Sequence, residues 1–133
     1  MILVDTSVLI DFFKGENNNS CDKFRDILES AIPFGITSQI FQEVLQGVKS
    51  ISEYKKLKKY LESQRFFHPK DSVATYAQAA KIYFDCRKKG ITIRSTIDCL
   101  IAQVAMEHNV SLLHNDNDFE AIAKVVQLKQ FRS

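Results

Sequence analysis

The amino-acid sequence predicts an α/β fold built around a mainly parallel sheet, and two observations lead to this prediction. Short, uninterrupted apolar runs recur along the chain, and such runs are typical of strands that are buried on both faces. Between them lie longer segments with apolar residues at helical spacing, so strands and helices alternate. With 133 residues, of which 45% are hydrophobic, the chain is expected to form a single domain, residues 1–133.

About five strands are predicted in this sheet. The first apolar run opens the chain and stops abruptly at Asp5, and the third precedes Pro69. The expected strands are residues 1–4, 34–37, 66–68, 110–113 and 125–128. In an open parallel sheet, ligands bind in the crevice outside the carboxyl ends of the strands.

The segments that flank these strands predict seven helices. Ser20 and Ser38 are expected to cap two of them, and Gly90 is expected to stop the longest. The expected helices are residues 8–13, 20–30, 38–46, 51–61, 71–89, 96–108 and 120–124. The longest is expected to turn one apolar row inward, namely Val73, Tyr76, Ala77, Ala80, Tyr83 and Phe84.

Composition excludes several classes of protein. The 18 basic and 16 acidic residues give a net charge of +2, which argues against a highly basic nucleic-acid coat protein and an acidic disordered tail. No membrane association is expected, because no apolar run approaches the ~20 residues of a membrane span. The first residues also lack a basic segment, so a secretory signal is not expected. Three widely spaced cysteines are typical of reduced thiols in a cytoplasmic protein.

Four acidic residues are predicted to meet at the carboxyl edge of the sheet. Asp5 follows the first strand and Asp116 the fourth, while Glu43 and Asp98 lie near the start of two helices. Taken alone, each acid has an ordinary explanation as a turn residue, a helix cap, a first-turn acid or a solvated side chain. Together they favour a metal site, because clustered carboxylates are stabilised by a hard cation such as Mg²⁺ or Mn²⁺.

The segments around these acids resemble the motifs of the PIN-domain nucleases, in particular the VapC-type toxins of toxin–antitoxin pairs. The four segments are ILVDTSVLID at residues 2–11, SQIFQEV at 38–44, IDCLIA at 97–102 and LHNDNDF at 113–119. They follow the family's order and span nearly the whole chain. The resemblance implies a PIN-like three-layer domain.

The same resemblance implies a metal-dependent endoribonuclease that hydrolyses RNA phosphodiester bonds. The family's catalytic and metal-holding acids would be Asp5, Glu43, Asp98 and Asp116, with Mg²⁺ as the cofactor and Mn²⁺ as an alternative. Supporting roles fall to three residues, Thr6, Ser7 and Asp118. Thr6 or Ser7 would orient Asp5 or a reacting water. Asp11 also matches a family feature, and a structural role is the alternative there.

The resemblance further implies an RNA substrate, a cognate antitoxin and a homodimer. Arg94 is the preferred phosphate contact because it precedes Asp98 on the same edge, whereas the lysines at 55–59 are predicted to be a solvated helix face. Four aromatic residues, Phe24, Phe41, Tyr54 and Tyr60, are expected to line a groove for an apolar partner helix or, alternatively, to complete the core. His68 and His114 are predicted to be structural, with contact to substrate or water as the alternative for His114.

Other classes of protein share parts of this pattern. The main rival is a catalytically silent PIN-like module that binds RNA or protein, which predicts erosion of the acids, yet all four are present. A haloacid-dehalogenase-type phosphatase needs a second aspartate where this chain has Ser7. The chain shows no phosphoacceptor pattern of a response-regulator receiver. It also has no glycine-rich loop, which a P-loop or Rossmann enzyme requires.

Overall fold

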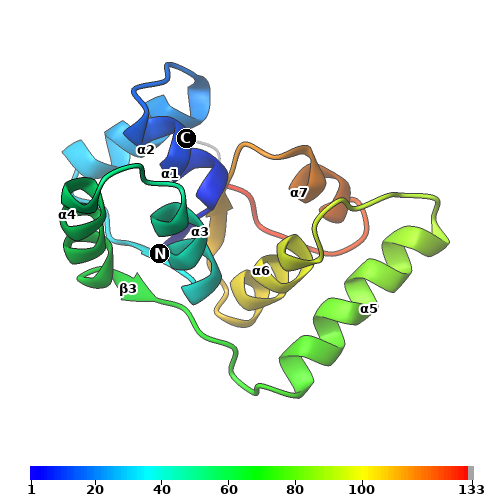
Figure 1. Ribbon diagram of the computed structural model, residues 1–133. Helices are drawn as coiled ribbons and strands as arrows, with labels where there is room; N and C mark the ends of the chain where they lie inside the picture. The colour runs from blue at the N-terminus through cyan, green and yellow to red at the C-terminus, as the bar shows by residue number, and fades with distance from the viewer. Residues whose placement is uncertain (132–133) are drawn as a thin grey trace.

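A four-stranded, fully parallel sheet flanked by helices forms the centre of the molecule (Figure 1). The structure is a computed structural model that describes residues 1–131. The strands are β1 (Ile2–Val4), β2 (Phe34–Ile36), β3 (Arg65–Phe66) and β4 (Ser111–Leu113), in the spatial order β3-β2-β1-β4. The predicted α/β class with a mainly parallel sheet is therefore confirmed.

The strand order reverses at β1, which lies between β2 and β4. Every residue of β1 is buried, as expected for a strand with both faces covered, and Leu3 pairs with Gly35 on one side and Leu112 on the other. The chain thus moves to one side of β1 to form β2 and β3 and to the other side to form β4. Such a reversal opens a crevice beyond the carboxyl ends of the two strands.

The predicted strand at residues 125–128 is wrong. Val125 and Val126 instead form a turn, in which their backbone N–H groups donate to the carbonyl of Ile122 at 2.9 and 3.0 Å. The chain rejoins the sheet edge only through a single parallel bridge between Leu112 and Gln130. Apolar content alone does not separate a strand from a turn whose side chains pack on the core.

Seven helices are present within residues 1–131, close to the predicted positions. They are α1 (Thr6–Phe13), α2 (Asn19–Glu29), α3 (Ser38–Gln46), α4 (Ile51–Glu62), α5 (Ala74–Lys88), α6 (Thr96–Glu107) and α7 (Asn117–Ile122). The caps predicted at Ser20 and Ser38 are instead Asn18 and Thr37, whose side chains accept from the backbone N–H groups of Cys21 and Ile40. Gly90, with φ of +77°, follows the C-cap Lys89 of α5 and stops this helix as predicted.

The inward face predicted for α5 is also wrong. The residues that face the core are Thr75, Ala79, Ile82 and Cys86, whereas Tyr76 and Phe84 are 50% and 55% exposed. The reason is that α5 packs along α6 rather than on the sheet (Figure 1), and small residues allow this close approach. The large residues Val73, Tyr76 and Phe84 of the predicted row therefore lie on the surface, whereas Tyr83 is partly buried against the core.

The aromatic residues predicted to line a groove divide between core and surface. Phe24 is completely buried, with its ring 4.9 Å from that of Phe12, and Phe41 packs at 5.4 Å against Phe66. Tyr54 and Tyr60 remain 36% and 38% exposed. Half of this set thus completes the core, which was the alternative interpretation.

The interior contains the three free cysteines, Cys21, Cys86 and Cys99. Burial of Cys99 agrees with its position among the buried apolar residues of α6, and this burial raises the pKa of its thiol to about 12.

Among the described residues, no helix combines the length and the apolar character needed to cross a membrane.

Candidate metal centre

Three carboxylates meet where the first turn of α6 approaches the start of α7, just beyond the end of β4. Asp98, Asp116 and Asp118 each offer an oxygen atom within 4.8 Å of the others, and we refer to these three residues as the acidic cluster. Asp98 and Asp116 were predicted as members of the site. Asp118, predicted only as a supporting residue, lies within the cluster itself.

Asp5 lies beside this cluster, directly after β1, and is 4% exposed. Its carboxylate caps α1 and accepts hydrogen bonds from the backbone N–H of Ser7 at 3.0 Å and from its hydroxyl at 2.7 Å. Burial nevertheless raises the pKa of Asp5, and the charge of Asp116 adds to this effect. Asp5 is therefore a helix cap, which was the ordinary explanation for this residue taken alone. It also lies at the edge of the acidic cluster.

Asp98 is the most perturbed acid of the site. It is 7% exposed in the first turn of α6, and burial together with the charges of Asp5 and Asp116 raises its pKa to about 8. Its Oδ2 atom is buried and has no hydrogen-bond partner among the described residues. A buried carboxylate oxygen that accepts no hydrogen bond is unusual and raises the free energy of the folded state. A bound cation would remove this cost.

Asp116 and Asp118 are fixed by backbone donors at the start of α7. Asp116 caps this helix, because its Oδ1 accepts from the backbone N–H of Asp118 at 2.9 Å. Asp118 in turn accepts from the backbone N–H groups of Arg94 at 3.0 Å and Ser95 at 3.3 Å. These bonds tie the entrance of α6 to that of α7, so the two helices present their acids to one another.

Glu43 reaches the site from α3 and is half-buried. Burial raises its pKa, with a further contribution from the charge of Asp5, while the hydroxyl of Thr6 donates to its Oε1 at 3.4 Å. The two hydroxyl residues predicted as supporting therefore serve different acids: Ser7 holds Asp5 and Thr6 contacts Glu43. The structure brings all four predicted acids to one edge of the sheet.

The donor set suits a hard divalent cation. It consists entirely of carboxylate oxygens, which Mg²⁺ and Mn²⁺ prefer, and a cation would compensate both the mutual repulsion of the acids and the unpartnered Oδ2 of Asp98. The residues present thus fit a metal centre of the kind that the sequence predicts.

A second layer of polar residues supports the loop that carries Asp116. Asn115 donates from its backbone to the hydroxyl of Ser7 at 3.0 Å and from its side chain to Asp11 at 3.4 Å. Asn18 also donates to Asp11, at 3.2 Å. These bonds give Asp11 a structural role, which was the alternative interpretation of this residue. The asparagine partners were not predicted, because Asn115 and Asp11 are distant in the sequence.

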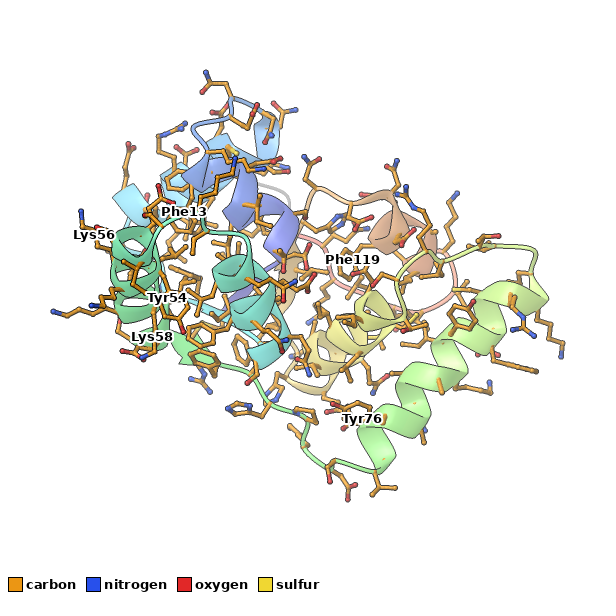
Figure 2. All side chains as sticks on the ribbon, viewed as in Figure 1. Phe13, Tyr54, Lys56, Lys58, Tyr76 and Phe119 are labelled. Atoms are coloured by element: carbon orange, nitrogen blue, oxygen red, sulfur yellow. The ribbon has the colours of Figure 1, made fainter. Side chains whose placement is uncertain are left out.

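The basic residues are distributed unevenly around the site. Arg94 is 77% exposed, and its Nε lies 3.8 Å from Asp118, at the rim of the acidic cluster. The lysines of α4 lie elsewhere: Figure 2 shows Lys56 and Lys58 on the opposite side of the molecule from Tyr76 of α5. Lys58 there pairs with Glu62 at 2.9 Å, as expected for a solvated helix face.

Comparison with known proteins agrees with this architecture. The model of the PIN domain family matches residues 2–125. The chain belongs to the PIN-domain family. Two curated relatives that also match along nearly their full length are a VapC ribonuclease of Mycobacterium bovis and ribonuclease VapC11 of Mycobacterium tuberculosis. Each is 31% identical over 130 residues, which cover 97% of this chain and 96% of the relative.

Solved structures share the PIN fold at lower identity. VapBC-1 from Haemophilus influenzae gives a TM-score of 0.72 at 19% identity, covering 98% of this chain and 97% of that one. A toxin–antitoxin complex from Klebsiella pneumoniae gives 0.69 at 21% identity, covering 98% and 100%. FitAcB from Neisseria gonorrhoeae gives 0.69 at 20% identity, covering 99% and 97%.

Proposed function

We propose that this PIN domain is a metal-dependent endoribonuclease that acts as the toxin of a toxin–antitoxin pair. The proposal is supported by the VapC ribonucleases among its relatives and by the PIN-domain match. The observation that carries it is the acidic cluster, which includes Asp98 with its buried Oδ2 that has no hydrogen-bond partner among the described residues. The three buried free thiols favour the cytoplasm as the site of action.

In this proposal the catalytic acids are Asp5, Glu43, Asp98 and Asp116, and the same four hold Mg²⁺ or Mn²⁺ with support from Asp118. The bound cation supplies charge neutralisation of the scissile phosphate and activation of a water. Ser7 and Thr6 orient Asp5 and Glu43 through the hydrogen bonds described above. Glu43, which is half-buried and therefore more accessible to solvent than the buried Asp5 and Asp98, is suited to accept a proton from the attacking water.

The RNA backbone needs positive charge near these acids, and Arg94 is the residue we propose for this contact. Its guanidinium is exposed at the rim of the acidic cluster, where it can bind a phosphate without leaving a buried charge. Replacement by alanine should weaken RNA binding and reduce its salt dependence, whereas Lys59→Ala on α4 should change neither.

The decisive experiment is cleavage of total cellular RNA by the purified protein with Mg²⁺, with EDTA and with Asp98→Asn. A few discrete fragments that disappear both in EDTA and in the variant support a selective, metal-dependent endoribonuclease. Asp26→Asn removes an exposed carboxylate of α2 and serves as the matched control, with normal cleavage expected. If no form cleaves RNA with Mg²⁺ or Mn²⁺, the catalytically silent binding module becomes the better interpretation.

We propose that an apolar helix of the antitoxin binds in the groove between α1, α3 and α4. This groove has a volume of about 470 Å³, and its lining includes Ile10, Phe13, Val44, Leu57 and Tyr60. Phe13 and Tyr60 are both exposed, so charged replacements there should not disrupt the core. Phe13→Asp should prevent copurification of a coexpressed antitoxin while RNA cleavage by the isolated protein stays unchanged.

We propose that a second copy of the chain covers the exposed apolar face of α5. Val73, Tyr76 and Phe84 are 78%, 50% and 55% exposed, and a groove of about 340 Å³ separates Tyr76 from Ile97 of α6. The molar mass of the protein by light scattering should be that of a dimer and should halve in Phe84→Glu. Tyr54→Glu, on α4, is the control, and a monomeric wild-type protein would refute the proposal.

A further inference from the structure

We propose that His114 is a positioning residue which, together with Gln130, holds the backbone of Asp116 in the orientation that the acidic cluster requires. The proposal deepens the nuclease function proposed above and rests on it. The sequence predicts a structural role for His114, whereas this proposal gives it a specific task in the metal centre.

The geometry fixes the tautomer of the His114 ring. The backbone N–H of Asp116 donates to Nδ1 at 3.2 Å, and because an amide N–H can only donate, Nδ1 carries no proton. The proton of the neutral imidazole therefore lies on Nε2, which donates to Oε1 of Gln130 at 2.7 Å. Each nitrogen thus has a defined partner on a different part of the chain.

The surroundings hold this ring in place. The side chain of His114 is 6% exposed, and its ring lies 5.0 Å from that of Phe119, the buried aromatic of α7 labelled in Figure 2. Gln130 belongs to the segment that bridges to Leu112 of β4, and the carbonyl of His114 accepts from the hydroxyl of Ser20 at 3.2 Å. The carboxylate of Glu120 also lies near the ring, at 3.7 Å from Nε2.

The consequence for the metal centre follows from the position of Asp116. His114 is the first residue after β4, and Asp116 is the cap of α7. The bond from the Asp116 N–H to Nδ1 sets the backbone angle at which the carboxylate of Asp116 leaves the chain toward Asp98. Partners that orient a ligand without touching the metal contribute roughly 10- to 100-fold to metal affinity.

A residue that only packs and one that positions through Nδ1 respond differently to substitution. His114→Phe retains the ring on Phe119 and removes both nitrogens. His114→Asn places an acceptor oxygen near the position of Nδ1 and loses the ring and the contact with Gln130. If His114→Asn recovers the Mn²⁺ affinity and the kcat that His114→Phe loses, the hydrogen-bond acceptor is the functional atom.

His108 provides a matched control. Its Nε2 lies 2.7 Å from the carbonyl oxygen of His68, and its ring lies 5.2 Å from that of Phe67, so its environment parallels that of His114. It follows α6 at the end opposite to Asp98. His108→Phe therefore perturbs a comparable ring without contacting the acidic cluster.

The experiment measures Mn²⁺ affinity by titration calorimetry, thermal stability in EDTA, RNA-cleavage kinetics and the ¹⁵N spectrum of the imidazoles. We expect the His114 ring of the metal-free wild-type protein to show a protonated Nε2 and an unprotonated Nδ1. His114→Phe should weaken Mn²⁺ binding about 10- to 100-fold and lower kcat with a smaller change in KM, His114→Asn should recover most of both, and His108→Phe should change neither.

Three results would overturn the inference: wild-type Mn²⁺ affinity in His114→Phe, no rescue by asparagine, or a proton on Nδ1 in the wild-type protein. Failure of the proposed nuclease function is distinguishable from these. A wild-type protein that binds Mn²⁺ but does not cleave RNA would refute the nuclease, while the titration and the spectrum still decide the role of His114.

Discussion

The backbone N–H of Asp5 donates to the carbonyl oxygen of Leu113 at 2.9 Å, so the first residue after β1 is bonded to the last residue of β4. This bond extends the pairing of two neighbouring parallel strands by one step beyond their ends. Because Asp116 follows Leu113 by three residues, the bond brings a predicted acid of the N-terminal segment next to one near the C-terminus. The site is thus a direct product of strand pairing at the point where the sheet order reverses.

Ser7→Ala should reduce cleavage while leaving the fold intact. The Ser7 hydroxyl donates to Asp5 at 2.7 Å and accepts from the backbone N–H of Asn115 at 3.0 Å. Its loss therefore removes one restraint on the Asp5 carboxylate and one on the loop that carries Asp116. We expect a decrease in kcat of about 10- to 100-fold, as for other residues that orient metal ligands. The cost in stability should be about 1 kcal/mol. Steady-state kinetics and urea unfolding test this, with Ser38→Ala at an exposed position as control.

The metal-free protein should become less stable as the pH rises through neutrality. Burial and the neighbouring acids raise the pKa of Asp98 to about 8 in the folded state, from an ordinary value of 3.8. The folded state therefore binds more protons than the unfolded state between these values, so the free energy of unfolding falls across this range as the pH increases. Below pH 4 both states are protonated, and the penalty is absent.

Asp98→Asn should remove much of this pH dependence. In EDTA at pH 8, the variant should unfold at a higher temperature than the wild-type protein, because each unit of pKa shift corresponds to about 1.4 kcal/mol. Added Mg²⁺ should stabilise the wild-type protein and leave the variant unchanged. Calorimetric scans from pH 5 to 8 test this, and a wild-type melting temperature that rises with pH in EDTA would contradict it.

Two glutamates should separate catalysis from stability. Glu43→Gln should lower kcat by about 10² to 10⁴-fold, the range typical of a group that transfers a proton, with little change in folding. Glu107 instead accepts from the Thr75 hydroxyl at 2.6 Å and the backbone N–H of Lys70 at 3.1 Å. Glu107→Ala should cost about 1–3 kcal/mol of stability without an effect on cleavage. Equal kinetics for Glu43→Gln and wild type would remove Glu43 from the proposed mechanism.

Gly35→Ala should destabilise the sheet. A Cβ atom on Gly35 would lie 2.4 Å from Cε2 of Phe67 and 2.9 Å from the carbonyl oxygen of Arg65, so β2 could no longer approach β3 without a shift. We expect a loss of about 1–3 kcal/mol, as for other overpacked positions. At Gly47 the nearest atom is 3.6 Å away, so Gly47→Ala should be nearly neutral. Chemical denaturation of both variants distinguishes this packing effect from a general loss of glycine flexibility.

Several features of the fold could be predicted because they depend on local sequence. Three of the four strands lie within one residue of the predicted runs, since a strand buried on both faces needs continuous apolar residues. The helix stop at Gly90 follows from its positive φ, which few other residues adopt readily. Asp5, Asp98 and Asp116 were recognisable because each acid interrupts or starts an apolar element.

Other features depend on contacts between distant segments. Helical spacing marks two candidate faces on α5, one rich in aromatics and one containing Thr75, Ala79, Ile82 and Cys86, and only the packing against α6 selects the second. Val125 and Val126 have the composition of a strand but are held in a turn by the carbonyl of Ile122.

The α/β class, the order of the elements and the acids placed at their ends follow from residue type and spacing along the chain, so they could be predicted before any contact was known. The grouping of Asp118 with Asp98 and Asp116, and the bonds of His114 to Asp116 and Gln130, became visible only in the folded chain. Hydrogen bonds and electrostatic repulsion act over a few ångströms in space, and separation along the chain does not report that distance until the strands have paired.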